Sequence, residues 1–167
     1  MTERKQHHDI YETIQITPDA PYPGNDLPVR LYRQALSGSR DTLITGFKRL
    51  FTSHGWSEPW INGIYDFHHF HAEAHEVLGC AAGRVTVQLG GPNGPKLTLQ
   101  AGDAVLLPAG VTHKRLEASA DYRILGSYPH DQEPDLRKGD PKEWEVVTTA
   151  IQDVQIWDQD PVTGTRT

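Results

Sequence analysis

The chain has 167 residues, of which 37% are hydrophobic and 23% charged, and its formal net charge is −6. This composition is typical of one folded globular domain with a sizeable core, and the acidic balance argues against a nucleic-acid partner, which would favour a basic face. No apolar run could span a bilayer, the first residues lack the apolar stretch of a signal peptide, and the single cysteine, Cys80, excludes an internal disulfide framework. We therefore expect a cytoplasmic protein without a membrane partner.

The first part of the chain, residues 1–60, is expected to form an arm followed by a helix. Residues 1–30 are polar and rich in proline, which predicts an arm wrapped on the domain. Within this arm, residues 11–16 (YETIQI) alternate between polar and apolar side chains and predict a short strand.

Residues 40–54 show a different pattern. Apolar side chains recur there at helical spacing, at Leu43, Phe47, Leu50 and Phe51. Asp41 is placed to cap the start of this helix, and His54 with Gly55 is placed to end it. We expect it to be the only substantial helix of the chain.

From residue 61 to residue 128 the chain changes to short β-type runs separated by turn signals. Strands are predicted over residues 64–71, 75–81, 84–89, 96–100, 104–107, 112–117 and 122–128. Short strands at this spacing predict an all-β sandwich or barrel of the jelly-roll type. The C-terminal extension, residues 129–167, begins as charged loop, and its alternating segment 144–157 predicts one more strand or a cover. We predict a single domain over residues 1–167.

The most informative residues are histidines and a glutamate around a predicted strand–turn–strand. His69 and His71 are separated by one residue, so on a strand their side chains point the same way, about 6.5–7 Å apart, and both can bind one ion. Glu76 follows across the turn, and His113 returns on a later strand after a Pro-x-Gly turn. Imidazole and carboxylate together form a ligand set for one divalent transition metal, and Fe, Mn, Ni or Zn would suit it.

These residues also carry a resemblance to a known family. The stretch from Gly63 to Gly83 resembles the first cupin motif, G-x5-H-x-H-x4-E-x6-G, at every fixed position. A second stretch from Gly102 resembles the second cupin motif up to His113, but Glu117 stands where that motif has its asparagine. The flanking context, including HGW at 54–56 and DPVTG at 160–164, is similar to the YjlB-like cupins.

The resemblance implies a cupin double-stranded β-helix, a jelly-roll barrel, which here would carry one N-terminal helix and extended terminal arms. It also implies a metal inside the barrel, held by His69, His71, Glu76 and His113. Cupins include dioxygenases and isomerases as well as binding and regulatory modules, and a fold alone does not select among these functions. Single-domain cupins commonly pair, so the resemblance and the exposed strand edges favour a homodimer.

Strand alternation assigns further side chains to the cavity. With His69 and His71 facing inward, Tyr65 and Phe67 should face inward too. Tyr65 is therefore a candidate catalytic base, and Phe67 a candidate substrate contact.

The same alternation applies on the later strand. With His113 inward, Arg115 and Glu117 should follow it to the cavity side. Arg115 could pair with a substrate carboxylate or phosphate, or it could simply neutralise Glu117 at the barrel mouth. Glu117 is a second candidate catalytic base.

Two other histidines lie beside the ligand set. His68 and His75 are expected at surface or supporting positions, with His75 the alternative ligand if Glu76 does not bind. Trp56 and Trp60 either line the cavity mouth or pack the N-terminal helix on the barrel.

Two functions follow from these features. One is a metal-dependent enzyme on a small polar molecule, of dioxygenase type or, with a base beside the metal, of isomerase type. The alternative is a non-catalytic module that binds or senses a small molecule.

Overall fold

A computed structural model describes residues 10–167. The start of the predicted arm, residues 1–9, lies outside the described residues. The strands are β1 (Glu12–Ile14), β2 (Val29–Tyr32), β3 (Trp60–Asn62), β4 (Glu76–Ala82), β5 (Arg84–Leu89), β6 (Lys96–Gln100), β7 (Ala104–Leu107), β8 (His113–Ala118) and β9 (Arg123–Ser127). The helices are α1 (Arg40–Ser53), the short 3-10 helix η2 (Pro141–Glu143) and α2 (Trp144–Asp153). None of the helices in residues 10–167 has the length and apolar character that a membrane crossing needs.

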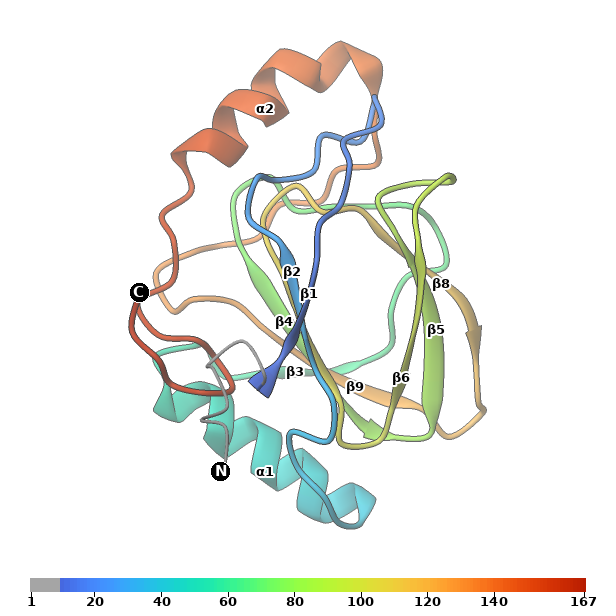
Figure 1. The fold of residues 1–167 in the computed structure, drawn as a ribbon, viewed down its shortest axis with the longest axis vertical. Helices are drawn as coiled ribbons and strands as arrows, with labels where there is room; N and C mark the ends of the chain where they lie inside the picture. The colour runs from blue at the N-terminus through green and yellow to red at the C-terminus, as the bar shows by residue number, and fades with distance from the viewer. Residues whose placement is uncertain (1–9) are drawn as a thin grey trace, which may run out of the picture.

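The strands form two antiparallel sheets that face each other (Figure 1). The larger sheet has the order β1-β2-β7-β4-β9-β3, and the smaller has the order β6-β5-β8. This mostly-β architecture agrees with the predicted class, and β5, β6 and β7 have the bounds that the turn signals predicted. The predicted strand in the arm is also present, as β1. Two strands of the larger sheet, β2 and β3, were not predicted.

Strand β4 lies at the centre of the fold because both of its faces are covered. All seven of its residues are buried. Leu78 and Cys80 pack between the two sheets, whereas Val77 and Ala81 pack on the other face with α1. Glu76 therefore begins a strand that is enclosed on both sides, and its parity with Leu78 directs its side chain to the space between the sheets.

Helix α1 covers the outer face of the larger sheet. Its apolar stripe, formed by Leu43, Phe47 and Phe51, is buried there. The Oγ of Ser39 accepts the N–H of Thr42 at 3.2 Å and caps the helix, so the prediction that Asp41 caps it is wrong. Asp41 lies in the first turn, where its charge still favours the positive end of the helix. His54 and Gly55, the latter with φ +82°, end the helix as predicted.

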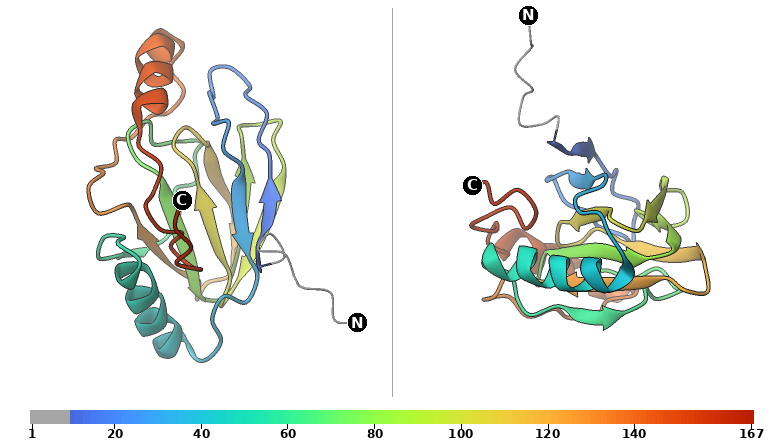
Figure 2. Two further views of the ribbon diagram at one scale, coloured as in Figure 1. Left: turned by 60° about the vertical axis from the view of Figure 1, so that its left-hand side comes forward. Right: turned by 90° about the horizontal axis from the view of Figure 1, so that it is seen from below.

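The C-terminal extension forms a second helix, which the sequence did not predict. In α2, Ala150 and Ile151 lie three and four residues after Val147, and all three pack together with Phe70 and Ala72. A short apolar pattern can fit both a period of two and a period of 3.6, and tertiary packing here selected the helix. The expectations of one more strand and of a single substantial helix are therefore wrong. After α2 the chain returns along the outer face of the larger sheet towards α1 (Figure 2).

Candidate metal centre

The segment that carries His69 and His71 is extended but is not a strand. Residues 64–71 were predicted as one, and the structure has only isolated bridges there, His69 with His113 and Phe70 with Arg137. Each bridge joins the segment to a different neighbour, so no continuous ladder forms. Side chains still alternate from residue 69 to residue 71, and this is enough to direct the imidazoles of His69 and His71 to the same side.

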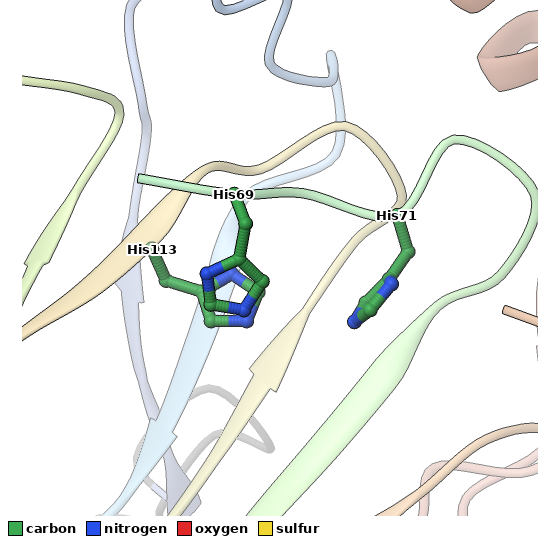
Figure 3. Close-up of side chains that lie close together, drawn as sticks. All are labelled: His69, His71 and His113. Carbon is green, nitrogen blue, oxygen red and sulfur yellow. The ribbon is translucent and has the colours of Figure 1, made fainter. Parts of the chain in front are cut away.

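Three imidazoles meet inside one end of the space between the sheets, as Figure 3 shows. One ring nitrogen from each of His69, His71 and His113 lies within 4.8 Å of the other two. His69 and His113 are each only 3% exposed. Across residues 10–167 no other group of three or more histidine, cysteine or acidic side chains is gathered in this way.

Each imidazole is oriented by a backbone carbonyl at its Nδ1. The pairs are His69 with Phe67 at 3.0 Å, His113 with Val111 at 3.0 Å, and His71 with Asp135. A carbonyl oxygen can only accept, so each Nδ1 donates, and in the neutral ring Nε2 keeps its lone pair. When the three rings are neutral, their Nε2 lone pairs are directed to one point, which is the chemistry that a divalent cation requires, so these residues fit a metal.

Glu76 adds a carboxylate to this group. Its Oε1 lies 3.3 Å from Nε2 of His113 and 3.5 Å from Nε2 of His71. Burial opposes the charged carboxylate, but its interactions with the adjoining His113 and His71 hold the pKa of Glu76 well below its usual range. Glu76 is therefore ionised, and it can offset part of the charge of a cation.

The two histidines of the His-x-His pair differ in protonation. Burial and then the neighbouring His113 lower the pKa of His69 to about 3, so this ring is neutral. Burial also acts to lower the pKa of His71, but the hydrogen bond and charge of Glu76 outweigh it and raise that pKa to about 8. Glu76 thus attracts positive charge to the point where the imidazoles converge.

The imidazoles lie in the wall of a cavity of about 430 Å³. Its lining is formed by Trp60, Ile61, Asn62, Gly63, Ile64, Tyr65, His69, His71, Glu76, Leu78, His113, Tyr128, Pro134, Asp135 and Leu136. A larger, open hollow of about 1150 Å³ beside α2 contains none of these histidines. We take the smaller cavity as the functional one, because the ligand-bearing side chains face it.

The chain is similar to one curated protein over most of its length. It is 38% identical over 141 residues to "Uncharacterized protein YjlB" of Bacillus subtilis (strain 168), which covers 84% of this chain and 82% of the relative. The chain belongs to the YjlB family. The resemblance to the YjlB-like cupins, which rested on the sequence around the two motifs, is thereby confirmed. No family model matches the chain.

Several solved structures show weaker similarity. RmlC from Streptococcus suis, solved with dTDP-D-xylose, is 14% identical with a TM-score of 0.37, over 70% of this chain and 69% of that one. The polyketide cyclase RemF from Streptomyces resistomycificus is 17% identical with a TM-score of 0.38, over 90% of this chain and 99% of that one. A DUF861 family protein from Thermotoga maritima is 19% identical with a TM-score of 0.36, over 59% of this chain and 96% of that one.

In this member of the YjlB family, Glu117 does not face the cavity. The pairing of β8 with β5 shifts between Arg115, opposite Val87, and Glu117, opposite Thr86, so Leu116 is an extra residue in the strand. Such a bulge reverses the alternation beyond it, and Glu117 is exposed on the outer face. The prediction that Glu117 faces the cavity as a base is therefore wrong.

Arg115 keeps the parity of His113 but does not line the cavity. Its Nε donates to the carbonyl of Ile64 at 3.0 Å, and its guanidinium lies 4.0 Å from the carboxylate of Asp66. Its acidic neighbour is thus Asp66 and not Glu117, and it is not among the residues that line the cavity. Arg115 holds the segment that leads to His69.

The two predicted aromatic residues are placed differently from each other. Tyr65 lines the cavity at its mouth and is 54% exposed. Phe67 stacks against Tyr65 with ring centroids 4.8 Å apart and lies outside the cavity lining. The carbonyl of Phe67 orients the imidazole of His69. The side chain of Phe67 does not reach the cavity, where it was predicted to contact the substrate.

Neither His68 nor His75 belongs to the imidazole group. Nδ1 of His75 accepts the N–H of Ala109 at 2.9 Å, and its Nε2 lies 3.1 Å from the carbonyl of Gln155. His75 therefore anchors the C-terminal extension. The ring of His68 lies near Tyr22, with centroids 5.6 Å apart, on the side away from the cavity lining.

Several residues of the cavity were not predicted from the sequence. Trp60, for which two roles were open, lines it, and its Nε1 donates to the hydroxyl of Tyr128 at 3.0 Å. Trp56 instead donates to the carbonyl of Gln159 and packs with the helix. Tyr128 directly follows β9, so strand alternation could have predicted that it faces the cavity. The sequence of the charged loop contains no pattern that predicts a role for Asp135.

Proposed function

We propose that this protein is a metal-dependent cupin enzyme that acts on a small molecule in the cavity beside His69, His71 and His113. The observation that carries this proposal is the convergence of three carbonyl-oriented imidazoles within 4.8 Å in a cavity wall. We further propose that the two facing sheets form the double-stranded β-helix that family membership implies.

The metal would be held by the three histidines together with Glu76. Fe, Mn, Ni or Zn, once bound, would supply a Lewis acid or an oxygen-activating centre. The carbonyls of Phe67, Val111 and Asp135 keep the rings in position, so that little reorganisation is needed. The apolar part of the wall would displace water from a substrate that lies against it.

Oxidative chemistry is better supported than isomerisation, because isomerisation needs a base close to the metal. Of the two predicted bases only Tyr65 lines the cavity, where its ring centroid is 5.1 Å from that of His69 and its side chain is 54% exposed at the mouth. Glu117 is outside the cavity. The carboxylate of Asp135 already accepts the N–H groups of Ala72 and Glu73 at 2.8 and 2.9 Å and pairs with Arg137 at 2.8 Å. Burial and the charge of Glu76 raise the pKa of Tyr128, which keeps its phenol neutral and a weak base.

Because Tyr65, the one predicted base in the cavity lining, is largely exposed, the cavity also supports a second candidate function. A module that binds or senses a small molecule needs a metal and a cavity but no proton-transfer group. Turnover separates the two functions, because a module would bind a ligand tightly and leave it unchanged.

Oxygen uptake by the iron-loaded protein tests this proposal. The full chain would be loaded anaerobically with Fe(II), its metal content measured by mass spectrometry, and oxygen consumption followed with a panel of small diols, enols and ketones. Consumption that requires both iron and one compound, and that is lost in His113→Ala, would support a dioxygenase. Tight binding of a compound without oxygen uptake or product would support the module instead, and failure to bind any metal would refute both.

We also propose that the protein forms a homodimer. β1 and β3 are the outer strands of the larger sheet, and β6 is an outer strand of the smaller sheet, so each presents an edge that a second copy could use. Sedimentation equilibrium at micromolar concentration tests this directly, and a mass of one chain throughout the concentration range would refute it.

A further inference from the structure

Beyond the four ligand side chains, the cavity is lined mainly by apolar groups. These are Trp60, Ile61, Ile64, Leu78, Pro134 and Leu136. No lysine or arginine lines the cavity among the residues that the structure describes. A ligand held here meets positive charge only at the metal position.

Three cationic side chains of this region do not line the cavity. Arg115 donates to the carbonyl of Ile64 and lies near Asp66. The Nζ of Lys138 lies 4.9 Å from the centre of the Phe67 ring, on a side chain that does not line the cavity. The third cation of this region, Arg137, is paired with Asp135 and Glu143.

Apart from Asp135, whose carboxylate is paired with Arg137 and accepts two backbone N–H groups, the polar groups that remain on the cavity wall are neutral. The hydroxyl oxygen of Tyr128 accepts the N–H of Trp60 at 3.0 Å, which fixes the phenol in place and leaves its hydrogen for Glu76 or a ligand. Asn62 and Tyr65 contribute an amide and a second phenol. Such groups recognise hydroxyl or carbonyl oxygens and cannot compensate a second ionic charge.

We propose that the ligand has one oxygen-bearing head that binds the metal and a body that is apolar or aromatic and carries no charge. This inference rests on the proposed function, since it takes the metal position as the anchor for the head. A carboxylate or phosphate on the body would lose its hydration against apolar walls with no cation to replace it. The expected small polar substrate is thereby narrowed to an amphipathic molecule with a neutral body.

Two diols that differ only in the body test this proposal. 4-Methylcatechol and 3,4-dihydroxybenzoate share the chelating head, and one carries a methyl group where the other carries a carboxylate. Their dissociation constants would be measured on the Co(II)-loaded full chain from its visible absorption, which reports binding to the metal. We expect 4-methylcatechol to bind at least about tenfold more tightly, and equal or tighter binding of 3,4-dihydroxybenzoate would overturn the proposal.

A cation placed at the cavity rim provides a matched variant. Ile61 is 42% exposed and lines the cavity, so Ile61→Lys can keep its charge in water while reaching the ligand body. This variant should reduce the preference to about threefold or less by improving the binding of 3,4-dihydroxybenzoate. Ile156→Lys, at a residue that is 45% exposed and outside the cavity, should leave the preference unchanged. An unchanged preference in Ile61→Lys would also overturn the proposal.

Metal loading is measured first, so that the proposed metal-dependent function and the proposed neutral ligand body can be refuted separately. If the protein does not bind Co(II) or any other divalent metal, the proposed function is refuted. The neutral-body inference is then tested on the metal-free protein with 4-methylphenol and 4-hydroxybenzoate, followed by the fluorescence of Trp60 against a Trp60→Phe background. Preference for 4-methylphenol supports a neutral body, and preference for 4-hydroxybenzoate contradicts it.

Discussion

His69 and His113 are joined through their backbones as well as through the convergence of their rings. The N–H of His69 donates to the carbonyl of His113 at 3.2 Å, the N–H of His113 donates back at 2.9 Å, and the ring centroids are 4.1 Å apart. A single β-bridge of two backbone hydrogen bonds thus holds two proposed metal ligands side by side, although they lie more than forty residues apart in the sequence. Because the bridge lies directly at the ligand positions, the site is preorganised without a continuous strand around His69.

Asp135 should control the orientation of His71. Its carbonyl accepts from Nδ1 of His71, and its carboxylate accepts the N–H groups of Ala72 and Glu73. We expect Asp135→Ala to free this loop and to weaken metal affinity by about 10- to 100-fold, while the protein remains folded. Competition with a chromophoric chelator measures the affinity. The exposed Asp131→Ala is the control, and an equal loss in both variants would contradict a specific role for Asp135.

The two glutamates of the motifs should behave in opposite ways. Glu76→Gln removes the buried carboxylate beside His71 and His113, so metal affinity should fall by at least about tenfold. Glu117→Gln changes an exposed side chain beyond the bulge in β8, and metal content and affinity should remain as in the parent protein. Isothermal titration with Zn(II) distinguishes them. A comparable loss in Glu117→Gln would mean that the outer position of this carboxylate is wrong.

Gly79 should be required for α1 to pack on the larger sheet. A Cβ at this position would lie 2.8 Å from Cγ of Phe47, in the buried face between β4 and the helix. Gly79→Ala should therefore lower the free energy of unfolding by about 1–3 kcal/mol, as measured by urea denaturation. In a Phe47→Leu background the same change should cost less, because the smaller side chain leaves room. An identical cost in both backgrounds would contradict direct contact.

Cys80 should be chemically inert in the folded protein. Its side chain is fully buried in the core between the sheets, and burial raises the pKa of its thiol to about 11. Because only the thiolate reacts quickly, reaction with a disulfide reagent at pH 8 should be slow and should accelerate as urea unfolds the protein. Rapid, complete reaction without denaturant would show that this strand opens far more readily than its burial implies.

The parts of the site that were predicted correctly depend on short-range geometry. Two side chains one residue apart point the same way in any extended segment, so His69 and His71 converge although residues 64–71 form no strand. The same reasoning failed for Glu117, because a one-residue bulge at Leu116 reverses the alternation and has no signal in the sequence.

Other features of the cavity depend on contacts between distant segments. Asp135 reaches His71 across 64 residues, from a loop whose composition indicates only exposure to solvent. Helix α2 formed where alternation predicted one more strand or a cover, and in it Val147 and Ile151 pack with Phe70. Local patterns do not contain this information, since it arises from which segments meet in the folded chain.

The most direct test of the metal centre is the metal content of matched histidine variants. Untagged full-length protein would be reconstituted with Fe(II), Mn(II), Ni(II) or Zn(II), and bound metal would be counted by mass spectrometry in the parent chain, His69→Ala, His71→Ala, His113→Ala and His68→Ala. We predict about one equivalent in the parent and in His68→Ala, and a sharp loss in the other three, all with unchanged circular dichroism. No bound metal in the parent protein, or an equal loss in His68→Ala, would contradict the account.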